Sequence, residues 1–465
     1  MTSTVATRTA ATPGAAVRRS DNAARALLGV IGAGALGVVY LWWSNTPSVI
    51  GGAQWITNGG RLCGLLAGYT APVLVLLMAR IPVVDRNLGT DRLARWHAMG
   101  GRYMIGLVLC HVTLIIWGYS LTDDSGVVHQ TTQIVFHYPD MIKATLGVLL
   151  LFGVGIVSAR AARRRMRYET WYYLHLATYL AIFLTFFHQL SNGDEFIHDT
   201  AARTAWYCLY LGAAAVILWF RFCVPLRDAS RHQLRVAEVR PEAPGVVSVL
   251  ITGRYLDELA ARTRPGQFFR WRFLTPGLAW AANPYSLSAP FGNNGSPHGA
   301  TPSMRITVKE RGGHSGALAA LRPGTRVLAE GPYGAFTQAR RSSPKVLLLA
   351  GGVGITPLRA LFETIPAGRG ELTLIYRAGR AEDLVFRAEL ERIAEARGAA
   401  LHFLLGPRAE VGEPLQTRNL LQLVPDLREH DVYLCGPDGM VGTAREALDT
   451  AGVPPYRIHH ESFEF

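Results

Sequence analysis

Six long apolar runs constrain the fold of this chain more than any other feature of its sequence. A helix needs about 20 apolar residues to cross the ~30 Å hydrocarbon layer of a membrane, and each run is about that long. The remainder, from about residue 230, has the Pro/Gly turns and short alternating strands of a soluble protein. We therefore predict six transmembrane helices followed by a soluble half. The runs lie near residues 25–43, 60–80, 101–119, 141–159, 172–190 and 204–223.

Basic residues predict the direction in which the spans cross. Arginines precede the first run and separate the second from the third and the fourth from the fifth, whereas 44–59 and 120–140 contain no Lys or Arg. Cytoplasmic loops accumulate Lys and Arg, so both termini and the soluble half are expected in the cytoplasm, with the spans in the cell membrane. The same arginines explain much of the net charge of +13, so we expect no nucleic-acid partner.

Four histidines fall within two of these spans. His97 and His111 belong to the third span with its lead-in, and His175 and His188 belong to the fifth. Ionisable side chains at membrane depth are costly and indicate function. The separations of 14 and 13 positions correspond to about 21 Å and 19.5 Å along a helix. Because both spans run in the same direction, His97 should meet His175, and His111 should meet His188.

Neutral imidazole is a good iron ligand, so two such pairs predict two stacked, six-coordinate b-type haems. The five cysteines form no CxxCH motif, so thioether attachment is not expected. The spacing of 13 leaves His175 and His188 about 140° apart on an ideal helix, and we therefore predict a π-bulge or kink in the fifth span. Hydrogen bonding of the histidines between helices is the alternative.

The region 230–338 has the signals of a flavin domain. Strands such as GVVSVLITG and MRITVKE alternate with Pro/Gly turns and predict a small antiparallel β-barrel. A flavin needs an aromatic face, hydroxyls for its ribityl chain and backbone amides for its pyrophosphate. Tyr285, Ser286 and Ser288 in NPYSLSAP are candidates for the first two, and Gly313 and Ser315 in KERGGHSGAL for the third.

The region 342–465 alternates strands and helices, which predicts a parallel α/β sheet with its site at the carboxyl ends of the strands. In KVLLLAGGVGITPLRAL a buried strand, a glycine turn and a helix follow one another. Such a turn lets the phosphates of a nicotinamide cofactor approach the positive helix end. The turn residues are Gly351, Gly352 and Gly354, with Thr356 predicted as N-cap and Pro357 as the first helical residue.

Two other strands of this region end in candidate site residues. VYLCGPDGM places Cys435, Gly436 and Pro437 at a strand end, and LTLIYRAGR is followed by Arg377 and Arg380. NPYS, the glycine/serine turn, GGVGITP, CGP and a terminal IHHESFEF occur in the order typical of the ferredoxin-NADP reductase family. Joined to six spans with paired histidines, the chain resembles the ferric reductase and NADPH oxidase superfamily over about residues 25–465.

This resemblance implies roles for several residues. A C-terminal aromatic, Phe463 or alternatively Phe465, would cover the flavin, and Cys435 would lie beside the hydride-transfer position. Asn283 stands where the family usually has Arg or His for holding FAD, with Arg270 or Arg272 as substitutes. Arg377 and Arg380 sit where a 2′-phosphate would be recognised, which favours NADPH over NADH. The alternative is that both arginines are solvated surface residues that do not bind the nucleotide.

The expected parts form one electron path from NAD(P)H through FAD and two haems to an external acceptor. Asp123, Asp124, Asp194 and Glu195 in the outer loops favour ferric iron or another metal, because they are hard oxygen donors. Reduction of O₂ to superoxide is the alternative, and the acids are then solvated loops. Two alternatives belong to other functional classes. The chain could be an electron-transfer module that supplies a quinone or a periplasmic partner, or a membrane protein without catalytic activity. The expected domains are 1–24 (polar segment), 25–225 (haem), 230–338 (FAD) and 342–465 (NAD(P)H).

Overall fold

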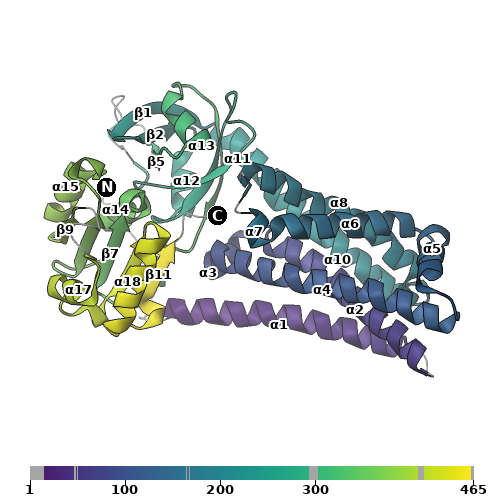
Figure 1. Cartoon of the computed structure of the whole chain (residues 1–465). Coiled ribbons are helices and arrows are strands. Elements are labelled where there is room, and N and C mark those ends of the chain that lie inside the picture. The colour runs from purple at the N-terminus through teal and green to yellow at the C-terminus, as the bar shows by residue number, and fades with distance from the viewer. Residues whose placement is uncertain are drawn as a thin grey trace, which may run out of the picture. The chain divides into compact units, whose positions relative to one another are not determined.

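The computed structural model describes residues 15–46, 49, 51–163, 165–166, 168–292, 302–406 and 413–461 (Figure 1). The chain divides into two compact units. We call residues 24–81 and 91–223 the membrane unit. The second, the soluble unit, contains the described residues of 15–23, 82–90 and 224–461.

Six helices within the described residues are long and apolar enough to cross a membrane, which confirms the predicted number of spans. Short helices α5 (Val127–His137), α7 (Arg160–Arg163) and α9 (Asp194–Ile197) lie between them. Large apolar side chains such as Val30 and Leu149 are exposed on these spans, as expected where lipid covers them. The six are α1 (Ala15–Ser44), α2 (Gly52–Leu77), α4 (Thr90–Thr122), α6 (Met141–Ser158), α8 (Tyr168–Asn192) and α10 (Thr200–Leu218).

The π-bulge predicted for the fifth span is contradicted by the structure, while the alternative, a kink, stays a prediction. Helix α8 is α-helical from Tyr168 to Asn192, and the π-helical turn of the bundle, Trp219–Cys223, follows α10 instead. A helix with its side chains is about 10–12 Å across, so imidazoles that leave α8 from its two flanks can both reach α4. The sequence argument overestimated how closely the two side chains must share one face.

Three glycines on α2, spaced four residues apart, allow the helices of the membrane unit to approach closely. A Cβ on Gly60 would lie 3.1 Å from the Ile115 backbone nitrogen on α4, and one on Gly64 would lie 2.5 Å from Nδ1 of His111. A Cβ on Gly68 would lie 2.8 Å from the side chain of Gln189 on α8. Small residues at this spacing are a common helix contact in membranes.

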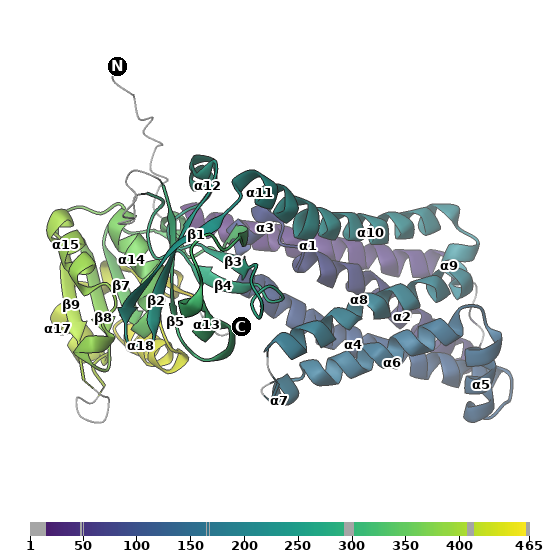
Figure 2. The same ribbon diagram turned by 90° about the horizontal axis from the view of Figure 1, so that it is seen from above.

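A proline inside α2 creates a further contact. Pro72 has no N–H, so the carbonyl of Gly68 loses its partner one turn earlier in the helix. The hydroxyl of Tyr210 on α10 donates to this carbonyl at 2.8 Å. Helices α6 and α8 also pack against each other along the bundle, as Figure 2 shows.

The first lobe of the soluble unit follows the short helix α11 (Val224–His232) and contains two three-stranded antiparallel sheets. Isolated bridges, Arg235 to Arg326 and Leu287 to Ile306, connect the sheets. The antiparallel strands are therefore as predicted, while a fully hydrogen-bonded closed barrel is not shown. One sheet has the order β1 (Arg235–Ala243), β2 (Val246–Thr252), β5 (Met304–Lys309), and the other β4 (Asn283–Ser286), β3 (Phe268–Phe273), β6 (Val327–Tyr333).

The second lobe contains a parallel sheet, as predicted; the sheet has five strands and is covered on both faces. Alternate residues of its central strand β7 (Val346–Gly351) point to opposite sides, and both sets are fully buried. Leu348 packs in the cluster that includes Leu358 of α14 (Ile355–Thr364), while Leu349 packs in the cluster that includes Leu448 of α18 (Asp438–Thr450). Figure 1 shows this lobe in green to yellow.

The strand order is β11 (Ile458–Glu461), β10 (Asp431–Cys435), β7, β8 (Leu372–Arg377), β9 (Ala400–Leu404). Helices α15 (Arg387–Arg397) and α17 (Thr417–Leu423) complete the two covering layers. The segment 82–90 also belongs to the soluble unit, although the sequence argument assigned it to the haem domain. Its helix α3 (Pro82–Leu88) carries Asp85, whose carboxylate accepts a hydrogen bond from the Gly334 N–H at 3.3 Å.

Candidate functional site

The four histidines of the spans form two pairs between α4 and α8. The ring centres of His97 and His175 are 5.9 Å apart with their planes at 73°, and those of His111 and His188 are 6.4 Å apart at 42°. This is the pairing that the sequence spacing predicted. Haem ligation itself stays a prediction.

The spacing within each pair fits an iron atom held by both rings. A metal–nitrogen bond is about 2.0–2.1 Å long. The atoms of an imidazole lie roughly 1.15 Å from its centre, given ring bonds of about 1.35 Å. Two rings on opposite sides of one metal then have centres about 6.3 Å apart, close to both observed values.

Hydrogen bonds at Nδ1 orient the rings. Nδ1 of His97 lies 3.1 Å from the Leu74 carbonyl, one of the last four carbonyls of α2 that lack a helical partner. Nδ1 of His111 lies 2.8 Å from the Gly60 carbonyl. Because a carbonyl only accepts, Nδ1 carries the proton in both rings, and Nε2 of each neutral imidazole is left as the metal-binding atom. The hydrogen bonds of His97 with the Leu74 carbonyl and of His111 with the Gly60 carbonyl were not predicted from the sequence. The spacing of Gly60 and Gly64 could have indicated that another helix approaches α2 closely at this point.

Of the two histidines on α8, only His175 has a hydrogen-bond partner at Nδ1 in the described part of the chain. Nδ1 of His175 lies 3.2 Å from Oγ of Ser158. Nδ1 of His188 is buried and makes no hydrogen bond within the described part of the chain.

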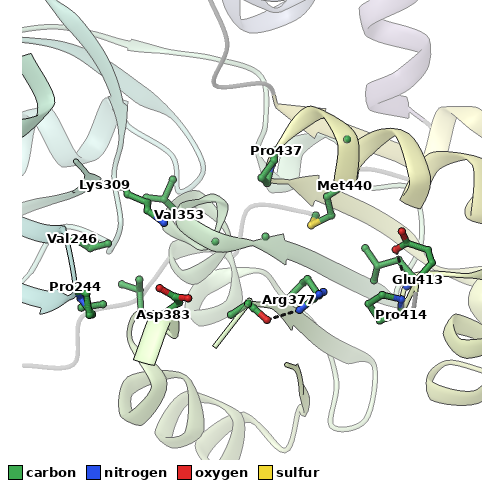
Figure 3. A pocket seen from close by; sticks show the side chains of 18 residues that line it. Pro244, Val246, Lys309, Val353, Arg377, Asp383, Glu413, Pro414, Pro437 and Met440 are labelled. Carbon is green, nitrogen blue, oxygen red and sulfur yellow. Dashed lines mark hydrogen bonds between the residues drawn. The ribbon is translucent and has the colours of Figure 1, made fainter. Parts of the chain in front are cut away.

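A pocket of about 330 Å³ opens at the carboxyl ends of β7, β8 and β10 in the soluble unit. Val246 and Lys309 of the first lobe line one side, and Pro437 and Met440 of the second lobe line another (Figure 3). This is the position that open α/β sheets offer to a nucleotide. Gly351, Gly352, Arg377 and Pro437 are the predicted nicotinamide residues that line it.

Close backbone packing explains the glycines of the turn. A Cβ on Gly354 would lie 2.2 Å from the carbonyl oxygen of Cys435, and one on Gly351 would lie 2.3 Å from the sulfur of Met440. Gly436 is less restricted, because its Cβ would lie 2.8 Å from the flexible Cε of Met440 and 3.2 Å from the backbone of Gly351. The glycines therefore let the ends of β7 and β10 meet beneath the pocket.

The predicted start of the helix after this turn is wrong. Helix α14 begins at Ile355 with Gly354 as N-cap, because the 3₁₀ turn Gly352–Gly354 leads directly into it. Thr356 and Pro357 are therefore the second and third helical residues. The Thr356 hydroxyl donates to the Val353 carbonyl at 3.0 Å instead of accepting from a helix N–H.

The two predicted phosphate-binding arginines differ. The guanidinium of Arg377 donates to the carbonyls of Ala378, Leu404 and Gly406, which fixes its charge at the pocket wall. The side chain of Arg380 is 68% exposed, pairs with two acidic neighbours in sequence and is not among the residues that line the pocket.

The predicted flavin residues lie on β4 and around α13 (Gly313–Ala317). Tyr285 is partly buried, its hydroxyl is 3.4 Å from Nδ1 of His314, and burial raises its pKa. Nδ2 of Asn283 is buried and has no hydrogen-bond partner within the described ranges, so it is available to a ligand. Arg270 is committed to the Ala282 carbonyl at 2.9 Å and to Glu330 at 3.7 Å.

The serines predicted to bind the flavin differ in their hydrogen bonding within the protein. Ser286 is buried on β4, whereas the hydroxyl of Ser288 is taken up by Thr307 at 2.8 Å and the Arg305 carbonyl at 3.2 Å. The geometry therefore does not favour contact between Ser288 and a ribityl chain. Ser315 donates to the Gly312 carbonyl at 3.0 Å and stabilises the turn that contains Gly313. Arg272 is partly buried on β3.

Cys435 is the last residue of β10 and is fully buried. Its thiol donates to the Glu461 carbonyl at 3.6 Å. Burial, followed by the charge of Glu461, raises its pKa well above the usual value and keeps the thiol neutral. Phe463 and Phe465, the candidates for covering the flavin, lie outside the described residues.

A buried charge cluster that the sequence argument missed joins the two lobes. Both oxygens of Glu389 on α15 accept from Arg305 on β5, at 2.8 and 2.9 Å, and one also accepts from Arg359 on α14 at 2.9 Å. The side chain of Arg305 is 2% exposed. These residues are 84 and 30 positions from Glu389, so no local pattern indicated the contact.

Two of the acids predicted as outer metal donors are committed to an arginine. Arg61 pairs with Asp194 at 3.0 Å and with Glu195 at 2.8 Å, and Glu195 is buried. Asp123 and Asp124 are exposed at the end of α4. No group of three or more metal-binding side chains occurs among the residues that the structure describes.

Comparison with known families agrees with this division. The family described as "Ferric reductase like transmembrane component" matches residues 63–186, and "Oxidoreductase NAD-binding domain" matches residues 348–446. Ferredoxin–NADP reductase B of Sorangium cellulosum is 30% identical over 252 residues, which cover 51% of this chain and 99% of that protein. The soluble half belongs to the ferredoxin–NADP reductase family, and the two family matches together give the fused architecture of the ferric reductase and NADPH oxidase superfamily.

The soluble half therefore contains an oxidoreductase-type NAD-binding domain and is similar along its length to a ferredoxin–NADP reductase. An NADPH oxidoreductase of Mycobacterium tuberculosis is 28% identical over 51% of this chain, which spans 62% of that relative's length, less than two thirds. A ferredoxin NADP⁺ reductase structure from Neisseria gonorrhoeae with bound FAD and NADP is 20% identical, with a TM-score of 0.40, covering 50% of this chain and 98% of that one.

Proposed function

We propose that this superfamily member passes electrons from cytoplasmic NAD(P)H through FAD and two b-type haems to an acceptor across the cell membrane. In this proposal residues 1–24 form a polar segment, and residues 25–225, 230–338 and 342–465 bind haem, FAD and NAD(P)H. The distribution of arginines supports a cytoplasmic location for both termini.

One observation carries the proposal. Two imidazole pairs lie in an apolar bundle, and their ring centres are separated by 5.9 and 6.4 Å, which fits one metal atom in each pair. A direct hydrogen bond between the two rings of a pair would bring the centres closer and would need no second nitrogen fixed by the backbone. The backbone bonds of His97 and His111 instead leave Nε2 unprotonated.

Each part of the chain has a task in this scheme. When bound, FAD divides the two electrons of a hydride and the haems carry them singly across the apolar layer. His97 and His175 hold one haem, and His111 and His188 hold the other. The residues Tyr285, Ser286 and Asn283, with the Gly313 turn, bind the flavin. The pocket below Arg377 binds the nucleotide, and we favour NADPH because this fixed cation suits a 2′-phosphate.

A ferric complex, or another metal complex, is the favoured acceptor. Because two imidazoles would hold each haem iron, the acceptor would receive its electron without becoming an iron ligand. The exposed carboxylates of Asp123 and Asp124 are hard oxygen donors near the end of α4. Superoxide formation is the competing outcome, detected as cytochrome c reduction that superoxide dismutase abolishes and that ferric chelate leaves unchanged. A module that serves a quinone or a periplasmic partner would show turnover only with that partner.

The test is the haem content and reduced-minus-oxidised spectrum of the purified protein with NADPH and FAD as reductant. We expect about two haems per chain. His97→Leu or His175→Leu should remove one haem, and His111→Leu or His188→Leu the other. His137→Leu, which changes an exposed histidine outside the pairs, should keep both. A protein without haem would contradict the proposal and would leave a membrane-tethered flavin reductase.

A further inference from the structure

A cation, an indole ring and one of the paired imidazoles are stacked in the membrane unit. The ring of Trp171 stacks on that of His175 with centres 5.2 Å apart and planes at 24°. The guanidinium of Arg163 lies 4.4 Å from the centre of the Trp171 ring. Arg163 ends α7 and the other two residues lie one helical turn apart on α8, so neighbouring elements build the stack.

Hydrogen bonds fix the orientation of the stack. Oγ of Ser158, the last residue of α6, accepts from Nε1 of Trp171 at 3.4 Å and lies 3.2 Å from Nδ1 of His175. One hydroxyl thus holds both rings. The ring contacts of His111 and His188 in the described ranges are with one another, so the two pairs differ in this respect.

We infer that Arg163, through Trp171, raises the reduction potential of the haem held by His97 and His175. This inference rests on the proposed function, because it requires that haem. An arginine is always charged, so its effect does not depend on pH. A fixed positive charge stabilises an iron centre more after it gains one electron than before. Arg163 is itself exposed, so water screens part of its charge, but the path from the indole to His175 runs into the bundle, where a lower dielectric constant lets the attraction weaken more slowly with distance.

The stack therefore affects the first electron transfer within the membrane unit, from the flavin to the haem held by His97 and His175. Trp171 contacts the ligand His175 and Arg163 contacts Trp171, so both are positioning residues that do not touch the reacting atoms. The haem at His97 and His175 is the first to receive an electron in the proposed direction. A raised potential at this haem favours transfer of each single electron out of the flavin. The other haem has no equivalent cation stacked on its ligands within the described residues.

The test is a redox titration of both haems in the purified full-length protein. In Arg163→Gln we expect the haem of His97 and His175 to bind electrons about tenfold more weakly, a shift of about 59 mV for one electron. The haem of His111 and His188 should shift less. Arg163→Lys, which keeps a cation over the indole, should retain most of the wild-type potential. The single-pair variants described above assign each potential to its haem.

Arg165→Gln is the matched control, because it removes one exposed arginine from the same loop without touching the stack. Equal shifts in Arg163→Gln and Arg165→Gln would overturn the inference, since the loop charge as a whole would then set the potential. An unchanged potential in Arg163→Gln with both haems bound would also overturn it. Trp171→Phe keeps an aromatic face and serves if Arg163→Gln loses haem; Trp171→Leu should then lower the potential more than Trp171→Phe. Absence of haem from the wild-type protein is a failure of the proposed function and is seen before any titration.

Discussion

The membrane unit and the soluble unit build their sites by opposite means. In the membrane unit the site consists of the four paired histidines in an apolar bundle, and backbone carbonyls orient two of these side chains, His97 and His111. In the soluble unit the pocket is shaped by backbone turns, where Gly351, Gly354 and Gly436 let two strand ends meet. Side-chain identity therefore specifies the first site, and permitted backbone approach specifies the second.

The largest expected effect tests whether the membrane site also depends on close backbone approach. In Gly64→Ala the new Cβ would lie 2.5 Å from Nδ1 of His111, so this ring must move and we expect loss of one of two haems. Gly59→Ala is the control on the same helix, since its Cβ would lie 3.9 Å from Leu114. Both changes favour the helix by up to about 1 kcal/mol, so helix propensity cannot separate them. Two haems retained in Gly64→Ala would contradict the prediction.

The corresponding change in the soluble unit is Gly354→Ala. Its Cβ would lie 2.2 Å from the Cys435 carbonyl oxygen, a backbone atom that cannot rotate away. We expect a loss of about 3 kcal/mol in the stability of the soluble unit and a loss of NADPH binding, with haem retained. Gly442→Ala in α18, where a Cβ would meet nothing within 4 Å, should be neutral or stabilising. Thermal unfolding followed by flavin fluorescence measures the stability of both variants. Similar melting temperatures for Gly354→Ala and Gly442→Ala would contradict the prediction.

The charge cluster between the lobes of the soluble unit gives a smaller effect. Glu389→Gln leaves Arg305 and Arg359 without their carboxylate, and we expect a loss of about 2 kcal/mol because the site is only partly shielded from water. Glu391→Gln removes an exposed pair with Arg387 and should cost less than about 0.5 kcal/mol. Urea unfolding monitored in both variants compares them directly.

The same cluster predicts a dependence on pH. Burial raises the pKa of Glu389, but the hydrogen bonds and charges of Arg305 and Arg359 outweigh it and lower the pKa below its usual value. Its contribution to stability is thus present above the unfolded-state pKa of about 4.3 and is lost as the pH falls through the lower, folded-state value. Wild-type protein should therefore lose stability in acid more steeply than Glu389→Gln, and parallel curves would argue against the assignment.

The smallest expected effect separates two arginines. Arg377→Ala should raise KM for NADPH by about tenfold, because a charge-assisted hydrogen bond contributes about 1.5–3 kcal/mol. Arg380→Ala should change KM by less than about twofold, since this exposed side chain pairs with Glu382 and Asp383. KM for NADH is the control and should respond less to Arg377→Ala. A larger effect from Arg380→Ala would show that it turns toward the nucleotide.

The sequence predicted those features that recur in local patterns. Apolar length indicated the six helices, the spacing of 97, 111, 175 and 188 indicated the pairing, and the glycine turn indicated the site at the strand ends. The helix start at Ile355 was missed because a threonine and a proline mimic a cap. The contact of Glu389 with Arg305 was missed because it links residues 84 positions apart. The position of the π-turn depends on packing in the sixth span, which no spacing of histidines reports.

Pro72 has a consequence for how this protein can vary. Because it supplies no N–H, the Gly68 carbonyl is left for the Tyr210 hydroxyl. An alanine at 72 would bring a rival donor to that carbonyl, and a phenylalanine at 210 would leave the carbonyl without one. The change at 210 is therefore harmful alone, whereas the Tyr210 hydroxyl can turn to Oε1 of Gln189, 3.3 Å away, when residue 72 is alanine; the two changes together restore an ordinary helical hydrogen bond. The effect of a substitution at one position therefore depends on the residue at the other, so we expect positions 72 and 210 to change together in evolution.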